Sequence, residues 1–127
     1  MKGNQETQAI DFAEQAKKVA AGKLLLECPI KSGSDEYAEV AYDFSKITGW
    51  GYADAMDCDP GNTNLFRISP KQALTLFAAA VSMEMPGVSA MDVKEQMVIG
   101  DSMNAIRIAT AFFVASTRAA SKRILSA

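Results

Sequence analysis

Two short stretches of the chain alternate apolar and polar side chains, which is the period of strands with one buried face. They are residues 23–31 and 37–44, and a polar turn at 32–36 separates them, so the pattern predicts a β-hairpin. Pro29 has no amide proton for a sheet ladder, which places the first strand at an edge. A lone hairpin is marginal in water and needs a cover of helices or strands. The apolar faces are expected to carry Leu24, Leu26, Cys28 and Ile30, then Ala38, Val40, Tyr42 and Phe44.

Weak helical patterns flank this hairpin. Residues 6–21 predict a helix with small apolar side chains that stops at Gly22. Residues 45–56 predict a short helix that begins at Thr48 or Gly49, although its glycines lower the helix propensity. The inward side chains of the short helix are expected to be Trp50, Ala53 and Met56.

Breaker residues and caps divide the second half of the chain. Residues 57–64 contain Pro, Gly and Asn and predict a loop. A helix start with a capping box is formed by Ser69, Pro70 and Gln72. This helix is predicted to run to about Met85, before a Pro-Gly pair, and is apolar almost all round. A further helix is predicted over residues 90–99 after Ser89, with its end at Gly100.

Residues 101–127 predict one long helix, with Asp101 as its N-cap. One apolar stripe contains Met103, Ile106, Thr110, Phe113, Val114, Thr117 and Ile124. A second stripe contains Ala105, Ile108, Phe112, Ala115 and Ala119, and the polar sector contains Asn104, Arg107, Arg118 and Lys122. Two stripes require either a central position in the fold or a partner chain.

Together these elements predict an α+β fold in a single domain of residues 1–127. An N-terminal helix or arm (1–22) precedes the hairpin (23–44), which packs on a helical body (45–127) of four or five helices with a long C-terminal helix. The apolar content of 49% and charged content of 22% are ordinary for a globular chain of this length.

Charge is distributed unevenly along the chain. Residues 1–64 carry 6 basic and 11 acidic side chains, a net −5, whereas residues 65–127 carry 7 basic and 4 acidic, a net +3. This asymmetry favours head-to-tail self-association, and the basic groups do not cluster as in a nucleic-acid-binding stripe. No signal peptide or membrane-spanning run is expected, and the two thiols, Cys28 and Cys58, suit a reducing cytoplasm.

The chain has no histidine, which removes the commonest general base and metal ligand. Counted from Asp57, the acidic loop places Gly61 at position 5 and Ile68 at the closing position, so it does not match a calcium loop. The segment around Trp50 lacks the lysine of a phosphate-binding loop. No catalytic, metal or cofactor residue is therefore predicted, and an enzyme of unrecognised type is the least favoured class.

Methionine is concentrated in one part of the chain. Of seven methionines, five are Met83, Met85, Met91, Met97 and Met103. Because methionine adapts to irregular apolar partners, the cluster has two interpretations: gap filling between packed helices, or a binding surface for apolar helices.

The order of the elements resembles the small tail assembly chaperones of long-tailed bacteriophages and prophages, especially those of Gram-positive hosts. The resemblance covers residues 23–116: Leu-Leu-Glu-Cys-Pro-Ile-Lys, Val-Ala-Tyr-Asp-Phe, Lys-Ile-Thr-Gly, Pro-Gly-Asn, an Ala-rich helix, Pro-Gly-Val, and Gly-Asp before a Phe-Phe helix. It implies a non-enzymatic, multimeric protein of the bacterial host cytoplasm. Such a protein coats the apolar helical tape-measure protein before the tail tube polymerises, often together with a frameshifted longer form.

The resemblance assigns no site residue. From the residue pattern, the client groove or self-association seam is predicted to contain Met83, Met85, Met91, Met97, Ile108 and Phe112. Two other functions stay open: a structural virion or scaffold subunit that forms a ring or tube, and a small nucleic-acid-binding regulator, which the positive second half supports weakly.

Overall fold

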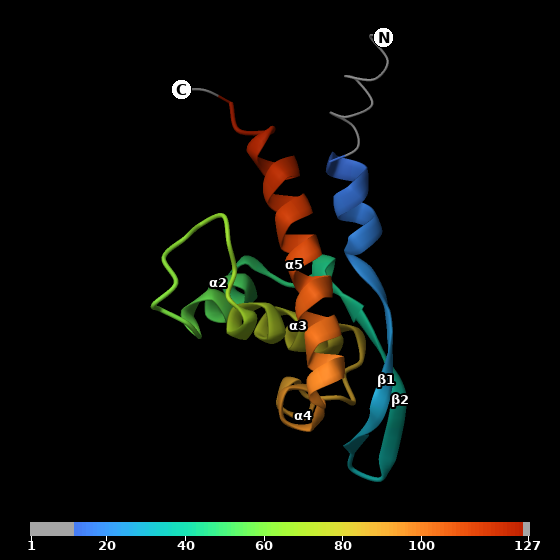
Figure 1. Ribbon diagram of the computed structural model, residues 1–127. Coiled ribbons are helices and arrows are strands. Elements are labelled where there is room, and N and C mark those ends of the chain that lie inside the picture. The colour runs from blue at the N-terminus through green and yellow to red at the C-terminus, as the bar shows by residue number, and fades with distance from the viewer. Residues whose placement is uncertain (1–11, 126–127) are drawn as a thin grey trace.

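The computed structural model describes residues 12–125 and has an α+β architecture, as predicted (Figure 1). The elements after a helix at 12–19 are β1 (Ala21–Ser32), β2 (Asp35–Asp43), a 3-10 turn η1 (Phe44–Lys46), α2 (Gly49–Asp57), α3 (Pro70–Glu84), α4 (Ala90–Gln96) and α5 (Ile99–Ser121). The predicted N-terminal helix at 6–21 therefore ends earlier than expected, and its first part lies outside the described residues.

The two strands form an antiparallel hairpin whose register pairs Leu24 with Val40 and Ser32 with Asp35. Its turn uses Gly33 at φ 63°, a conformation that favours glycine. The pairing is interrupted between Leu25 and Ile30. Pro29 lies within this interruption and cannot donate a ladder bond, which accounts for the break. The buried side chains of the hairpin face are Leu24, Leu26, Ile30, Val40, Tyr42 and, just after it, Phe44.

The prediction that Cys28 and Ala38 lie on the buried face of the hairpin is wrong. Cys28 is exposed because it lies in the interrupted part of β1, where strict alternation does not hold. Ala38 is exposed as well, on the paired strand opposite the interruption.

The capping prediction for α3 is confirmed. The Ser69 hydroxyl accepts a hydrogen bond from the Gln72 amide (3.2 Å), and the Gln72 side chain accepts one from the Ser69 amide (2.8 Å). α3 ends at Glu84, and it lies against the hairpin, α2, α4 and α5. It forms the centre of the core, where Phe77 and Val81 are fully buried.

The predicted N-cap role of Asp101 is wrong. α5 begins at Ile99 with Val98 as an N-cap that makes no side-chain bond, and Gly100 lies inside the helix. The Asp101 carboxylate, 3% exposed, instead accepts hydrogen bonds from the amides of Glu27 (3.0 Å) and Cys28 (3.3 Å). These amides lie in the interruption of β1, and their need for an acceptor explains why a buried carboxylate stands there.

The orientation predicted for α2 is also wrong. The helix begins after Thr48, as expected, but Trp50 is 82% exposed and Ala53 is exposed. Ala55 is the fully buried residue of α2, and Met56 is half-buried. A short helix with small side chains has no strong apolar stripe to select its inward face, so its position in the fold decides that face.

α5 buries members of both predicted stripes. The buried residues are Asp101, Ala105, Ala109, Phe113, Ala115 and Ala119. In contrast, Met103 is 49% exposed and Ile124 is 76% exposed. The polar sector is exposed as predicted. The helix ends at Ser121, earlier than predicted, and the last predicted residues lie outside the described part.

Within residues 12–125, no helix is both long enough and apolar enough to cross a bilayer.

Candidate protein-binding site

The second half of α5 extends past the hairpin and α4, and the helix at 12–19 runs beside it (Figure 1). Three hollows border this half of α5. Because the rest of the described chain does not close them, the second half of α5 is the candidate site for binding another polypeptide.

The first hollow, here called the α2 groove, lies between α2 and α5 and has a volume of about 280 Å³. It is lined by Phe44, Ile47, Tyr52, Leu76, Phe112, Phe113, Ser116, Thr117 and Ala120. Phe44 and Phe112 stack with ring centroids 4.6 Å apart and their planes 10° apart, so a rigid aromatic pair forms part of the wall. The lining contains no Asp, Glu, Lys or Arg, and the groove suits an apolar ligand surface.

The second hollow, here called the loop groove, lies between the loop at 58–69 and α5 and has a volume of about 480 Å³. It is lined by Phe66, Arg67, Ile68, Thr110, Phe113, Val114, Thr117 and Arg118. Phe113 and Thr117 line both grooves, which makes the two continuous around one side of α5. The loop groove differs by carrying two arginines and no carboxylate.

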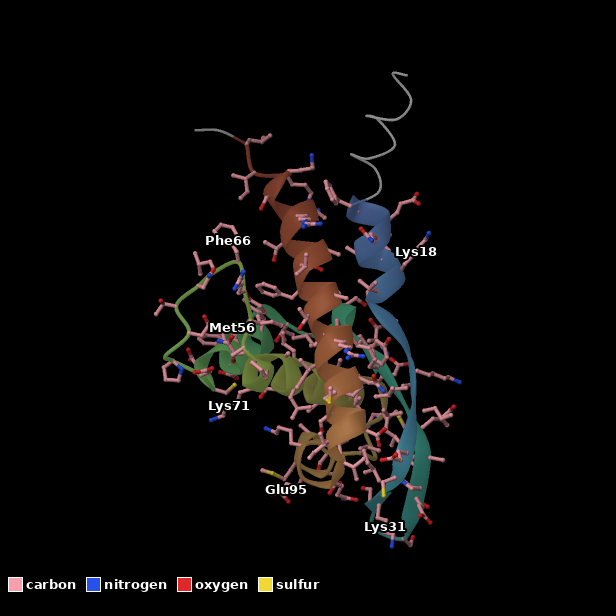
Figure 2. All side chains as sticks on the ribbon, viewed as in Figure 1. Lys18, Lys31, Met56, Phe66, Lys71 and Glu95 are labelled. Atoms are coloured by element: carbon pink, nitrogen blue, oxygen red, sulfur yellow. The ribbon has the colours of Figure 1, made fainter. Side chains whose placement is uncertain are left out.

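Hydrogen bonds fix the loop that forms this wall. The Asn62 side-chain amide donates to the Arg67 carbonyl (3.0 Å) and to the Gln72 side chain (2.7 Å). The Gln72 amide group in turn donates to the Met56 carbonyl (3.0 Å), and the Asn64 side chain accepts from the Phe66 amide (2.8 Å). Gln72, the capping-box partner of Ser69, thus also positions the loop. Figure 2 shows Phe66 on that loop beside α5. The Phe66 side chain is 71% exposed.

The third hollow lies between the helix at 12–19 and α5, has a volume of about 300 Å³, and is lined in part by Val19, Val114 and Arg118. The Arg118 guanidinium and the Lys122 ammonium lie 5.8 Å and 5.2 Å from the centroid of the Phe12 ring. These cation–π contacts connect the N-terminal helix to α5 near the end of the site.

Two titratable side chains outside the grooves have shifted pKa values. Burial raises the pKa of Tyr42 above its ordinary value. The Lys46 ammonium donates to the Glu84 carboxylate (2.6 Å), and this hydrogen bond raises the pKa of Lys46. Both belong to the packing of the hairpin end on α3.

The six residues predicted for the binding site do not form one surface. Met83 is 46% and Met91 is 56% exposed, whereas Met97 is 8% exposed and belongs to the hydrophobic core. The Met85 sulfur accepts a hydrogen bond from the Ala41 amide, and Ile108 is half-buried against the core. Of the six, Phe112 alone lines the α2 groove.

Most of the groove lining lies outside the six residues predicted for the site. Phe113 and Thr117 belong to a predicted apolar stripe of α5, whereas Tyr52, Phe66 and Arg67 have no predicted role. A signal was present at Leu65 and Phe66, two large apolar side chains without periodicity after a loop of breaker residues. Both are exposed, at 81% and 71%.

The described residues hold no group of three His, Cys, Asp or Glu side chains arranged for a metal ion. Cys28 and Cys58 are free thiols. The chemistry that the site itself offers is apolar contact and guanidinium hydrogen bonding.

Comparisons with protein-family models, with curated proteins and with solved structures found no match. The family resemblance therefore stays a prediction.

Proposed function

We propose that this protein is a non-enzymatic assembly chaperone of a long-tailed phage or prophage. It holds the apolar helical tape-measure protein in the bacterial host cytoplasm until the tail tube polymerises around that protein. The observation that carries the proposal is the α2 groove, an uncharged aromatic hollow along the second half of α5 that the described chain leaves open.

The dimensions of this groove suit a helical ligand. Its α5 wall runs from Phe112 to Ala120, which corresponds to about 12 Å or roughly two helical turns. Helix-in-groove recognition uses apolar anchors at i, i+3, i+4 and i+7, and two turns of about 12 Å are long enough to hold all four. The stacked Phe44–Phe112 pair supplies a rigid surface for such anchors, and Tyr52, 43% exposed, borders them.

A chaperone of this kind acts in several copies, because a tape-measure protein is long compared with one groove. Partners in the proposal are therefore the tape-measure protein, further copies of the chain and a frameshifted longer form. The alternative of a permanent virion or scaffold subunit uses the same open surface. Finished tails discriminate between the two, since purified particles lack a chaperone and contain a subunit in many copies.

Co-expression with the tape-measure protein of the same tail gene cluster tests the proposal. The groove variant Ser116→Glu/Ala120→Glu places two carboxylates in the α2 groove at partly exposed positions of α5. Burying carboxylates against an apolar client is costly, so the soluble client fraction should fall at least about tenfold. The matched control is Ile99→Glu, at the exposed first residue of α5 outside the three hollows, which should leave client solubility unchanged.

Circular dichroism and urea unfolding would verify that both variants are folded. A folded groove variant that keeps the client as soluble as the wild-type protein does would show that the α2 groove is not the client site.

A further inference from the structure

α2 carries an exposed face that has no role in the packing of its own chain. Trp50, Asp54 and Asp57 follow one another at i, i+4 and i+7, which places them on one side of the helix together with Ala53. All four are exposed, and Trp50 is 82% exposed. The exposed indole is the interface-like part of this face, because Trp is enriched in the energetically dominant residues of protein interfaces, and the two carboxylates give the face a negative charge.

The loop groove has complementary chemistry. Arg67 comes from the loop wall and Arg118 from the α5 wall, and apolar side chains lie between them. The ion pairs recorded within residues 12–125 are Lys23–Glu39 and Lys46–Glu84, so neither arginine is paired with a carboxylate of the described chain.

The electrostatics around the groove strengthen this complementarity. After Asp101, α5 carries no acidic residue; Arg118 lies in its last turn, and Lys122 and Arg123 follow directly after its end. The acidic residues of the loop region, Asp57 and Asp59, do not line the groove. A ligand that enters the loop groove therefore meets positive charge on both walls, which favours an acidic apolar segment.

We infer that the occupant of the loop groove is the exposed α2 face of a second copy of this chain. Trp50 of one copy inserts among Phe66, Ile68 and Val114 of the next. Asp54 and Asp57 then accept hydrogen bonds from the arginine guanidinium groups, which match carboxylates bidentately. The net charges agree with this arrangement, because α2 belongs to residues 1–64, which carry −5, and the groove belongs to residues 65–127, which carry +3.

This contact joins two different surfaces, so it is heterologous and repeats from copy to copy. Repeated contacts of this kind form a ring if the rotation between successive copies brings the last copy back to the first, and they form an open filament otherwise. The α2 groove shares Phe113 and Thr117 with the loop groove, and its other α5 lining residues, Phe112, Ser116 and Ala120, do not line the loop groove. The inference does not depend on the identity of the client.

Sedimentation velocity of the purified full chain over a concentration series tests the inference. The groove reversal Arg67→Glu/Arg118→Glu and the α2 reversal Asp54→Lys/Asp57→Lys each bring like charges together. Each alone should weaken self-association at least about tenfold. Combining both reversals in one chain restores opposite charges across the contact, and self-association should return to near the wild-type level.

The matched control is Glu95→Lys, an exposed reversal on α4 that Figure 2 shows at the end of the molecule away from Phe66. It should leave self-association unchanged, and added salt should weaken the wild-type contact. A wild-type protein that stays monomeric up to about 1 mM would overturn the inference. So would a combined variant that fails to regain association.

The outcome also separates this inference from the proposed function. If the reversals leave the oligomeric mass unchanged but reduce the soluble tape-measure fraction, the loop groove binds client, and the inference is wrong. If a short RNA oligonucleotide binds the wild-type protein at low salt and the groove reversal removes this binding, the occupant is nucleic acid, and the inference is wrong as well. If self-association behaves as expected while the client stays insoluble, the proposed function fails and the inference stands.

Discussion

The two halves of α5 have different surroundings although they belong to one continuous helix. In the first half, Ala105 and Ala109 are fully buried and Asp101 binds the interrupted strand β1. In the second half, the buried residues are bordered by three hollows and by the exposed side chain of Phe66. The first half stabilises the fold, and the second half presents a surface that is available to other chains.

The neighbours of each half explain the difference. The first half packs near β1 and across the long helix α3, and its alanines allow close approach. The second half is bordered by α2, by the loop at 58–69 and by the helix at 12–19, which are short or irregular elements. Short elements bury less apolar area, so the same helix periodicity leads to a closed core in one half and an open site in the other.

The largest expected effect contrasts two phenylalanines, one from each region. Phe77→Ala removes a fully buried ring from the core and should lower the free energy of unfolding by about 3–5 kcal/mol. Phe66→Ala removes a ring that is 71% exposed and should change the free energy of unfolding by no more than about 0.5 kcal/mol. Urea unfolding followed by circular dichroism measures both. Equal losses would mean that the loop belongs to the core.

A medium effect tests the contact that anchors the first half of α5. Asp101→Ala leaves the amides of Glu27 and Cys28 without their acceptor, and should cost about 1–3 kcal/mol in the same unfolding measurement. Asp101→Asn keeps one acceptor oxygen and should lose less. The control is Asn104→Ala, at an exposed residue one turn along α5. If Asp101→Ala lowers the free energy of unfolding no more than Asn104→Ala does, Asp101 has no anchoring role.

The smallest of the three expected losses of core or anchoring contacts concerns the connection between the two regions. Gln72→Ala removes side-chain hydrogen bonds to Ser69, Asn62 and Met56, and should cost about 1 kcal/mol. Its main expected effect is local: hydrogen exchange should become faster at residues 62–68 than in α3. Lys71→Ala, at the exposed neighbouring position, is the control. Unchanged exchange in the loop would show that Gln72 does not hold it.

The elements of this fold that depend on local signals could be predicted from the sequence. The hairpin follows from alternation and its glycine turn, and the start of α3 follows from Ser69 and Gln72, which lie three residues apart. The role of Asp101 could not be predicted, because its hydrogen-bond partners are 73 and 74 residues away. By its residue type and position Asp101 is a good N-cap, but its carboxylate binds the distant amides of Glu27 and Cys28 instead of the amides of its own helix.

The candidate site was predicted poorly for a related reason. The α2 groove brings together Phe44, Tyr52 and Phe112, which come from three elements separated in the chain. The cluster of methionines is a feature of composition, and α3 and α4 direct its members to different surroundings: Met97 to the core, Met83 to the surface. Phe112 was found because it lies in an apolar stripe of α5, the one long element with a clear periodicity.

The outer margins of the hairpin have a consequence for how copies of this chain can meet. The Lys31 amide and carbonyl are both bound by the Gln96 side chain, at 2.7 Å each, and Asp101 and Met85 bind outward amides of the two strands. A two-stranded sheet would otherwise offer unpaired ladders to a neighbouring strand and promote intermolecular cross-β growth. Because side chains of the same chain bind the amides of Glu27, Cys28, Lys31 and Ala41, fewer free donors are left for a strand of another copy to pair with.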